Sequence, residues 1–139
     1  MGTWGAEPFD SDTAQDYLDQ LVGLTAPQRL DAIKQTLEDV LGREDSRTSE
    51  SLPEEVVAAA AVITANLESG SEFSWNEEAS GVIRWLEKPI SVGIRDLALS
   101  ALDASIPEGN WWWQSWVDTS DREIAQACLS HVRLALRQG

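Results

Sequence analysis

Cys128 and His131 are the one cysteine and the one histidine of the chain, and they stand three residues apart. On a helix this spacing puts both side chains on one face, where a histidine can activate a neighbouring thiol as a nucleophile. A zinc site would need two more soft ligands, which the chain lacks. Because Cys128 falls within an apolar helical stripe, the pattern favours a buried, unreactive thiol beside a histidine at the edge of the core.

Asp10, Asp12 and Asp16 form a second candidate site, because carboxylates that converge can bind calcium or magnesium. An EF-hand loop would need further oxygen ligands and a glycine at its sixth position, where this sequence has Gln15. Acidic side chains also interact favourably with the positive end of a helix dipole. We therefore interpret these residues as helix caps and predict no metal site.

Recognised catalytic motifs are absent from the sequence, which has no Gly-x-Ser-x-Gly elbow, no His-Glu-x-x-His and no phosphate-binding glycine loop. The acid pairs Glu54–Glu55 and Glu77–Glu78 fall in predicted first helical turns, where solvated caps are the ordinary explanation. We expect no catalytic residue and no cofactor. A spatially assembled active site remains the alternative.

Trp111, Trp112, Trp113 and Trp116 place four large rings within six positions. Each ring buries about 150–250 Å², and tryptophan is enriched among the residues that dominate protein interfaces. On a helix Trp111 would project away from Trp113, so the rings do not easily enter one core. We name these four as candidate partner-binding residues, the alternative being that most of them fill the gap before the last helix.

The charge is strongly negative, at −14, with 24 acidic residues against 10 basic ones. Such a field repels phosphates, so we expect no membrane contact and no direct nucleic-acid contact unless the protein mimics a nucleic acid. Residues 1–55 hold 13 acids and 4 bases, so the field belongs mainly to the first part of the chain. A basic protein partner is expected, although the charge could also serve solubility alone.

The elements that must position these residues are all predicted as helices, since no segment alternates convincingly with period two. The first follows Asp10–Asp12 and ends at Gly23, and the second follows a capping box at Thr25–Gln28 and ends at Gly42. The expected apolar stripes are, in the first helix, Ala14, Tyr17, Leu18, Leu21 and Val22 and, in the second, Leu30, Ile33, Leu37, Val40 and Leu41. The solvent face of the second helix includes Glu38 and Asp39.

The run from Val56 to Ile63 is apolar all round, so we predict a central helix packed on several sides and ending at Gly70. Ser74 and Glu77 predict a cap for a fourth helix, which Pro89 ends. Its expected apolar face is Trp75, Ala79, Val82, Ile83 and Leu86.

Two more helices complete the prediction. The fifth is expected to bury Ile94, Leu97, Ala98, Ala101 and Leu102. The last is capped by Ser120 with Glu123 and is expected to bury Ile124, Ala127, Cys128, Val132 and Ala135. The sequence thus predicts an all-α fold, a compact single-domain bundle of five or six helices over residues 1–139, with an exposed connection at 43–52.

The expected compartment is the cytoplasm, because one cysteine offers no disulfide framework and residues 1–10 show neither a basic region nor an apolar run. The longest apolar stretch, Val56 to Ile63, is far too short to span a membrane.

The opening of the chain combines Gly2-Thr3-Trp4-Gly5 with Phe9-Asp10-Ser11-Asp12, followed by Ala14 and Asp16-Tyr17-Leu18. This motif resembles the start of a bacterial family catalogued as domain of unknown function 4259. The alanine-rich segment 56–65 and the tryptophans before the last helix resemble that family's layout, although its usual pattern is less crowded at 111–113. The resemblance implies a small bacterial cytosolic protein and transfers no catalytic residue.

The motif residues Gly2, Trp4, Gly5, Phe9, Asp10, Asp12 and Asp16 are interpreted as structural, with Trp4 and Phe9 packing over the end of the bundle. Charge and aromatic content together predict a non-enzymatic interaction module that binds a basic partner protein, as immunity and inhibitor proteins do. Two alternatives stay open. One is a small enzyme or metal-dependent protein using Asp10, Asp12 and Asp16 or the Cys128–His131 pair, and the other is a structural homodimer joined through the tryptophans.

Overall fold

The computed structural model describes residue 9 and residues 12–41, 53–67, 70, 73, 76, 81–87, 90–105 and 119–138. Within these ranges every regular element is a helix, which confirms the predicted all-α fold. None of the described helices is both long enough and apolar enough to cross a membrane. The predicted connection 43–52 lies outside the described residues.

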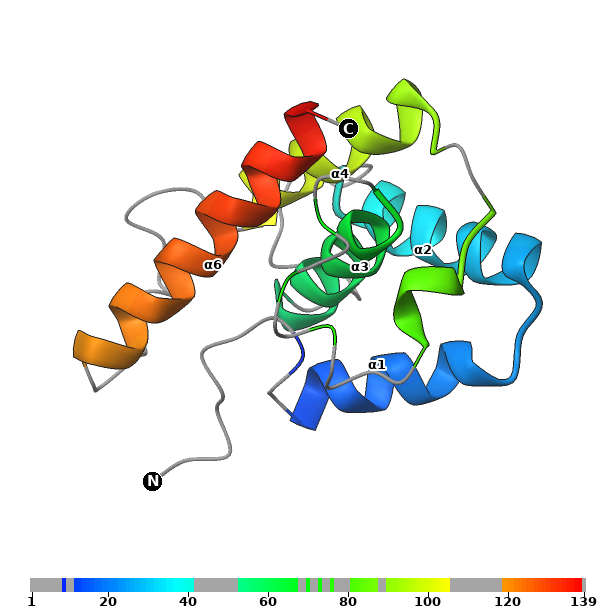
Figure 1. Ribbon diagram of the computed structural model, residues 1–139, viewed down its shortest axis with the longest axis horizontal. Helices are drawn as coiled ribbons and strands as arrows, with labels where there is room; N and C mark the ends of the chain where they lie inside the picture. Colours follow the sequence, from blue (N-terminus) through cyan, green and yellow to red (C-terminus); the bar gives the residue numbers. More distant parts are fainter. Residues whose placement is uncertain are drawn as a thin grey trace.

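The helices surround α3, which lies in the middle of the molecule with α1 below it, α4 above it, α2 on one side and α6 on the other (Figure 1). The described elements are α1 (Asp12–Val22), α2 (Ala26–Leu41), α3 (Pro53–Ala65), the 3-10 helix η4 (Val82–Arg84), α4 (Val92–Ser105) and α6 (Thr119–Gln138).

α3 is the buried centre of the fold, as the sequence predicts. Every residue from Val56 to Leu67 is buried, and α3 contacts α1, α2, α4, α6 and η4. Four consecutive alanines, 58–61, keep its surface narrow, so neighbouring helices approach closely. Burying each valine or isoleucine of this helix contributes roughly 1.5–3 kcal/mol to the stability of the fold.

The start of α2 is fixed by the predicted capping box. The backbone nitrogen of Thr25 donates to Gln28 Oε1 at 3.0 Å, and the backbone nitrogen of Gln28 donates to Thr25 Oγ1 at 3.3 Å. Two amide groups that the helix itself leaves unpaired are thereby satisfied.

Arg29, in the first turn of α2, ties α1 to η4. Its Nε and Nη2 donate to the carbonyl oxygens of Leu21 and Val22, at 2.8 and 2.9 Å. The guanidinium carbon lies 5.2 Å from the centre of the Trp85 ring, and Nη1 donates to the Trp85 carbonyl oxygen. A positive charge at the carboxyl end of α1 also offsets the negative end of its dipole.

α3 ends at Ala65, five residues before the predicted stop at Gly70. The buried side chain of Asn66 follows this end of the helix, and its Nδ2 donates to the carbonyl oxygens of Val62 in α3 and Val82 in η4. Gly70 has a different role. A Cβ added to it would lie 2.2 Å from the Thr64 carbonyl oxygen, so the chain folds back onto the end of α3 where a side chain does not fit.

The predicted fourth α-helix is wrong where the structure describes it. In the described part of residues 74–89 the regular structure is 3-10 and not α-helical, at Asn76 and in η4, although Val82 and Leu86 are buried as expected. Gly81 precedes η4 with φ of 75°, a left-handed conformation that interrupts a right-handed helix. Ser74, Trp75, Glu77 and Ala79 lie outside the described residues.

α4 and α6 pack together over α3. The predicted stripe of α4 faces inward, with Ala98, Ala101 and Leu102 fully buried. Arg133 Nη2 of α6 lies 3.3 Å from Asp103 Oδ1 of α4, and Arg95 Nη1 donates to the Leu136 carbonyl oxygen at 3.2 Å. The second bond satisfies a carbonyl at the end of α6.

Three residues of the predicted stripes are exposed instead. Val22, Leu41 and Ala127 face solvent, the first two at the last residue of their helices, where the core no longer covers them. The buried face of α6 includes Leu129 and Leu136 in addition to the expected Cys128, Val132 and Ala135. The predicted cap Ser120 lies within the first turn, because α6 begins at Thr119.

Candidate functional site

A groove of about 740 Å³ lies between α1, α2 and the beginning of α3, and we call it the α1–α2 groove. Its size falls within the range of sites that hold small ligands or short peptide segments. Its lining residues are Tyr17, Gln20 and Leu21 of α1, Leu24 of the following turn, Ala32, Gln35, Thr36, Glu38 and Asp39 of α2, and Glu55 of α3.

Tyr17 and Thr36 link α1 to α2 in the lining of the groove. The Tyr17 hydroxyl and Thr36 Oγ1 are 2.9 Å apart, and Thr36 Oγ1 lies 3.1 Å from the Ala32 carbonyl oxygen. Tyr17 is only 4% exposed, because its ring belongs to the apolar stripe of α1 and enters the core. A buried phenol needs a hydrogen-bond partner, and Thr36 supplies it from the neighbouring helix.

Burial raises the pKa of Tyr17 to about 12. The hydrogen bond between the Tyr17 and Thr36 hydroxyls lowers this pKa, and the negative charge of Glu55 raises it further. Tyr17 therefore keeps its proton at neutral pH and does not act as a base.

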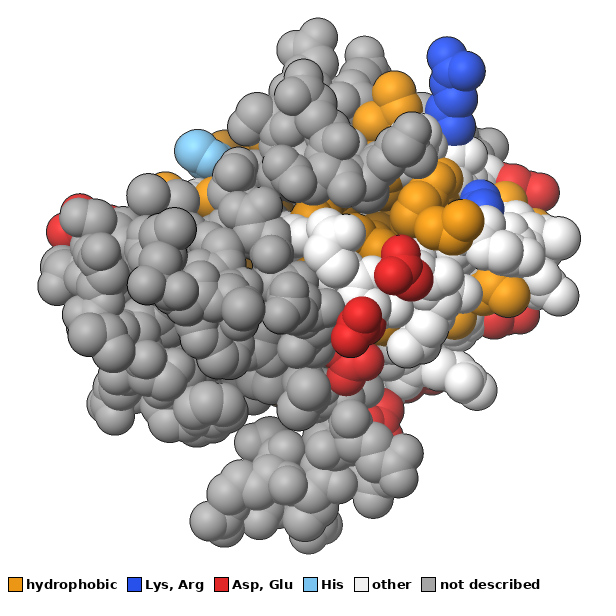
Figure 2. Space-filling model, turned by 90° about the horizontal axis from the view of Figure 1, so that it is seen from below, with side chains coloured by type: hydrophobic (Ala, Val, Ile, Leu, Met, Phe, Trp, Pro, Cys, Tyr) orange, Lys and Arg blue, Asp and Glu red, His pale blue; other side chains and the backbone are white. Residues whose placement is uncertain are grey.

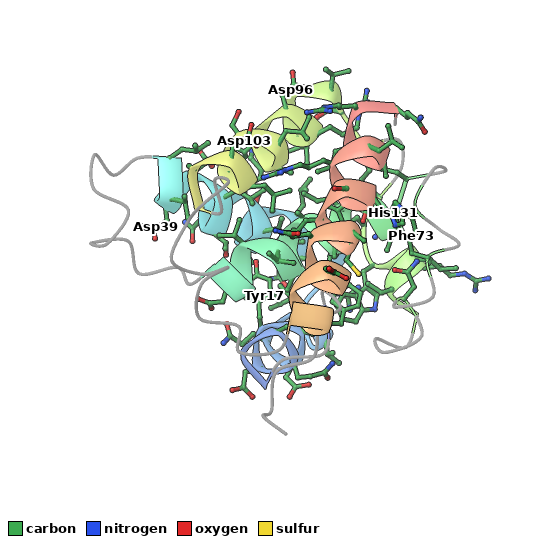
Figure 3. The ribbon with its side chains drawn as sticks, turned by 90° about the vertical axis from the view of Figure 1, so that its left-hand side faces the viewer. Tyr17, Asp39, Phe73, Asp96, Asp103 and His131 are labelled. Atoms are coloured by element: carbon green, nitrogen blue, oxygen red, sulfur yellow. The ribbon has the colours of Figure 1, made fainter. Side chains whose placement is uncertain are left out.

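Three of the residues that line the groove carry carboxylates. Glu38 and Asp39 belong to the last turns of α2, and Glu55 belongs to the first turn of α3, so two helix ends bring them together. In Figure 3 Tyr17 lies below the start of α3, and Asp39 lies near the end of α2. Among the described residues that line the groove there is no lysine or arginine.

The surface around the groove is also acidic. Asp16, Asp19 and Asp31 are exposed on α1 and α2, and acidic side chains lie along this described part of the molecule in the view from below (Figure 2). Across residues 12–41 the two basic residues are Arg29 and Lys34, and Arg29 is bonded to backbone carbonyls. The local field is therefore negative, and a concave surface concentrates it.

Cys128 and His131 lie in different environments on α6. Cys128 is 8% exposed and belongs to the hydrophobic core. His131 is exposed, and its ring stacks on Phe73 with ring centres 6.1 Å apart and planes 18° apart (Figure 3). Burial restricts access to the thiol, whereas the histidine takes part in an aromatic contact at the surface.

The predicted acidic cluster is described only in part. Asp12 is the first residue of α1, Asp16 is exposed one turn later, and Asp10 and the side chain of Asp12 lie outside the described residues. Across the described ranges no group of three or more histidine, cysteine or acidic side chains is placed to hold a metal ion.

Of the family motif, Phe9 is fully buried and its carbonyl oxygen accepts a hydrogen bond from Gln15 Nε2. This bond ties the opening of the chain to α1. Gly2, Trp4 and Gly5 lie outside the described residues, as do the candidate partner-binding residues Trp111, Trp112, Trp113 and Trp116.

Sequence reasoning did not find the α1–α2 groove. It treated Tyr17 as a core residue, Glu38 and Asp39 as a solvent face, and Glu55 as part of a helix cap. One signal was present: a tyrosine in an apolar stripe needs a polar partner, and Thr36 stands in the middle of the next helix. The sequence does not show which residue is the partner, because that depends on how α1 and α2 are placed relative to each other.

The chain matches known proteins at the level of a family. No curated protein matches the chain. No solved structure matches it either. The family described as domain of unknown function (DUF4259) matches residues 2–127, nearly the whole chain, and the protein therefore belongs to the DUF4259 family.

Proposed function

We propose that this protein is a non-enzymatic acidic interaction module that binds a basic partner protein. The proposal rests on the α1–α2 groove, whose lining includes three carboxylates and, among the described residues, no basic one. Opposite charge on a partner would speed the encounter and select against acidic competitors.

Further support comes from the use of the arginines. Arg29, Arg95 and Arg133 contact backbone carbonyls or Asp103, so their charges serve contacts within the fold. On α1 and α2 the acidic residues Asp16, Asp19, Asp31 and Glu38 are exposed. An acidic surface held on a well-packed helical scaffold suits an immunity- or inhibitor-type protein that covers a basic surface of its target.

The tryptophans at 111–113 and 116 are proposed as a second contact, in which one or more rings anchor the partner after charge has guided it. The two contributions separate in kinetics, since charge acts mainly on association and aromatic burial acts mainly on dissociation.

The proposal is tested by affinity capture with two immobilised forms of the chain. One is the wild type, and the other carries Asp16→Asn, Asp19→Asn, Asp31→Asn and Glu38→Gln, four changes at exposed positions that keep side-chain size. We expect mass spectrometry to find a basic protein enriched on the wild type, depleted on the neutralised form and released by salt. That protein is then purified and its binding measured directly.

Circular dichroism of both forms provides the control, because surface substitutions of this kind usually change stability by no more than about 0.5 kcal/mol each. A partner that is not basic, or one that binds both forms equally in purified form, would contradict the proposal.

A further inference from the structure

We infer that two copies of this chain associate through the solvent-facing side of α6, which pairs with the same side of a second α6 running in the opposite direction. This inference concerns a surface apart from the α1–α2 groove and does not depend on the proposed function. It rests on the order of the side chains along α6 and on the place of that helix in the fold.

The fold anchors α6 on one side only. Its inner side packs on α3 and α4 through buried residues that include Leu129, Val132 and Leu136. The helix runs along the edge of the molecule, on the other side of α3 from α2 (Figure 1). Because the inner side belongs to the core, the outer side is already ordered before it meets a partner, which lowers the entropy cost of binding.

Five exposed residues follow one line along this outer side, and we call them the outer α6 face: Glu123, Ala127, Ser130, Leu134 and Arg137. They succeed one another at spacings of four, three, four and three residues, the repeat by which paired helices meet along a seam. Leu134 is 50% exposed, so this line includes a large apolar side chain that the core does not cover.

The outer α6 face is complementary to itself when two copies run in opposite directions. Glu123 and Arg137 stand seven residues before and after Ser130, so a two-fold axis beside Ser130 sets each Glu123 opposite the Arg137 of the second copy. Ala127 and Leu134 stand three residues before and four residues after Ser130. The same axis therefore sets the small side chain opposite the large one to within one residue, about 1.5 Å along the helix.

The charges select the antiparallel orientation. A parallel pair would place Glu123 against Glu123 and Arg137 against Arg137, and like charges repel. An antiparallel pair makes the acid–base contact twice, once at each end of the interface. Ala127 and Ser130 are small, so the two helix axes can approach closely where they cross.

The distribution of charge also favours α6 as the contact. The whole chain carries a net charge of −14, so two copies repel each other at long range. Residues 122–139 hold three arginines and one glutamate, a local excess of positive charge. A second copy that approaches α6 therefore meets less repulsion than one that approaches the acidic α1 and α2.

The first test is sedimentation velocity of the full chain from micromolar to millimolar concentration, where we expect a dimer to form. Glu123→Arg and Arg137→Glu should each weaken dimerisation by about tenfold, because the symmetry repeats each like-charge contact at both ends of the interface. An equimolar mixture of these two variants should form a mixed dimer as tightly as the wild type, because opposite charges again face each other.

Two matched pairs of variants locate the interface. Leu134→Gln should weaken dimerisation by about tenfold through lost apolar burial, whereas Val22→Gln, at a residue 57% exposed at the end of α1, should leave it unchanged. Under oxidising glutathione, Ser130→Cys should give a disulfide-linked dimer, because two thiols beside a two-fold axis come within bonding reach. Ala104→Cys, at an exposed position of α4, should not. Circular dichroism checks that each variant keeps its helix content.

Salt distinguishes this contact from the capture of a basic partner. Raising the ionic strength from about 0.01 M to about 0.15 M shortens the Debye length from about 30 Å to about 8 Å, which screens the repulsion between two acidic copies. The dimer should therefore tighten severalfold, whereas binding of a basic protein should weaken.

A chain that stays monomeric at every concentration would overturn the inference. So would a dimer that Glu123→Arg, Arg137→Glu and Leu134→Gln leave intact, or a mixture of the two charge variants that fails to restore the dimer. A dimer that dissociates as salt is added would place the contact on oppositely charged surfaces and exclude the outer α6 face.

Discussion

The side-chain oxygen of Asn66 accepts a hydrogen bond from the backbone nitrogen of Leu86, at 3.1 Å. The Nδ2 of the same side chain donates to the Val62 and Val82 carbonyl oxygens, at 2.8 and 2.9 Å. Asn66 is 2% exposed, so one buried amide joins the end of the central helix to both sides of η4. Buried polar groups are costly to leave unpaired, so the hydrogen bonds of Asn66 should contribute strongly to stability.

Replacing Asn66 with alanine should therefore lower the free energy of unfolding by about 2–4 kcal/mol, because the buried Leu86 amide loses its acceptor. Urea unfolding measures the change, and hydrogen exchange at Leu86 should accelerate. Gln126→Ala, which removes an exposed amide from α6, is the matched control and should change stability by less than about 0.5 kcal/mol. Equal effects of the two variants would show that the Asn66 bonds carry little stability.

Arg29→Lys should lower the free energy of unfolding by about 1–2 kcal/mol even though the charge is kept, because an ammonium group does not reach the carbonyls of Leu21, Val22 and Trp85 together. Thermal unfolding is the measurement. Arg84→Lys, at an exposed position of η4, provides the comparison and should melt like the wild type. If both variants unfold at the same temperature, the hydrogen bonds of Arg29 to the three backbone carbonyls contribute little to stability.

Two glycines should respond oppositely to alanine. Gly70→Ala places a Cβ 2.2 Å from the Thr64 carbonyl oxygen, so it should destabilise the protein by about 2 kcal/mol or more. At Gly23 an added Cβ meets nothing within 4 Å, so Gly23→Ala should be neutral or stabilise by up to about 1 kcal/mol. Chemical denaturation of both variants decides the matter. A tolerated Gly70→Ala would rule out the close approach to α3.

Stability should fall in alkaline solution through Tyr17, the one tyrosine of the chain. Its pKa is about 12 in the folded protein and near 10 in an unfolded chain. Between these values the unfolded state binds fewer protons than the folded state, so the free energy of unfolding decreases as pH rises. The expected loss is about 2–3 kcal/mol between about pH 10 and pH 12.

Tyr17→Phe isolates this contribution, because the variant lacks the titrating group while other alkaline effects remain. The difference in unfolding free energy between wild type and variant should change with pH over that window. Tyrosinate absorbance reports the same titration directly. A pH-independent difference, or a titration near pH 10 in the folded protein, would show that the hydroxyl is not buried as described.

Local sequence patterns predict a helix or its first residue correctly where the residues responsible lie close together in the chain. The Thr25–Gln28 capping box and the apolar run Val56–Ile63 depend on residues close together in the chain, and both are present as expected. The family was also identified from its opening motif, and the match over residues 2–127 confirms it.

Predictions that depended on distant contacts were less successful. The end of α3 is fixed by Asn66, whose partners Val82 and Leu86 lie 16 and 20 residues away. The α1–α2 groove likewise depends on the Tyr17–Thr36 contact across 19 residues. Periodicity reports which face of a helix is apolar, but it does not report which helix that face meets.

If acidic charge draws a basic partner to this chain, the rate of association must depend on salt. The partner recovered by affinity capture is mixed with the wild-type chain in a stopped-flow instrument at rising ionic strength. Screening shortens the Debye length from about 10 Å at 0.1 M to about 3 Å at 1 M. We expect association to slow by about tenfold or more while dissociation changes little, and Glu38→Gln/Glu55→Gln to reduce the salt dependence. An association rate that is independent of salt would contradict it.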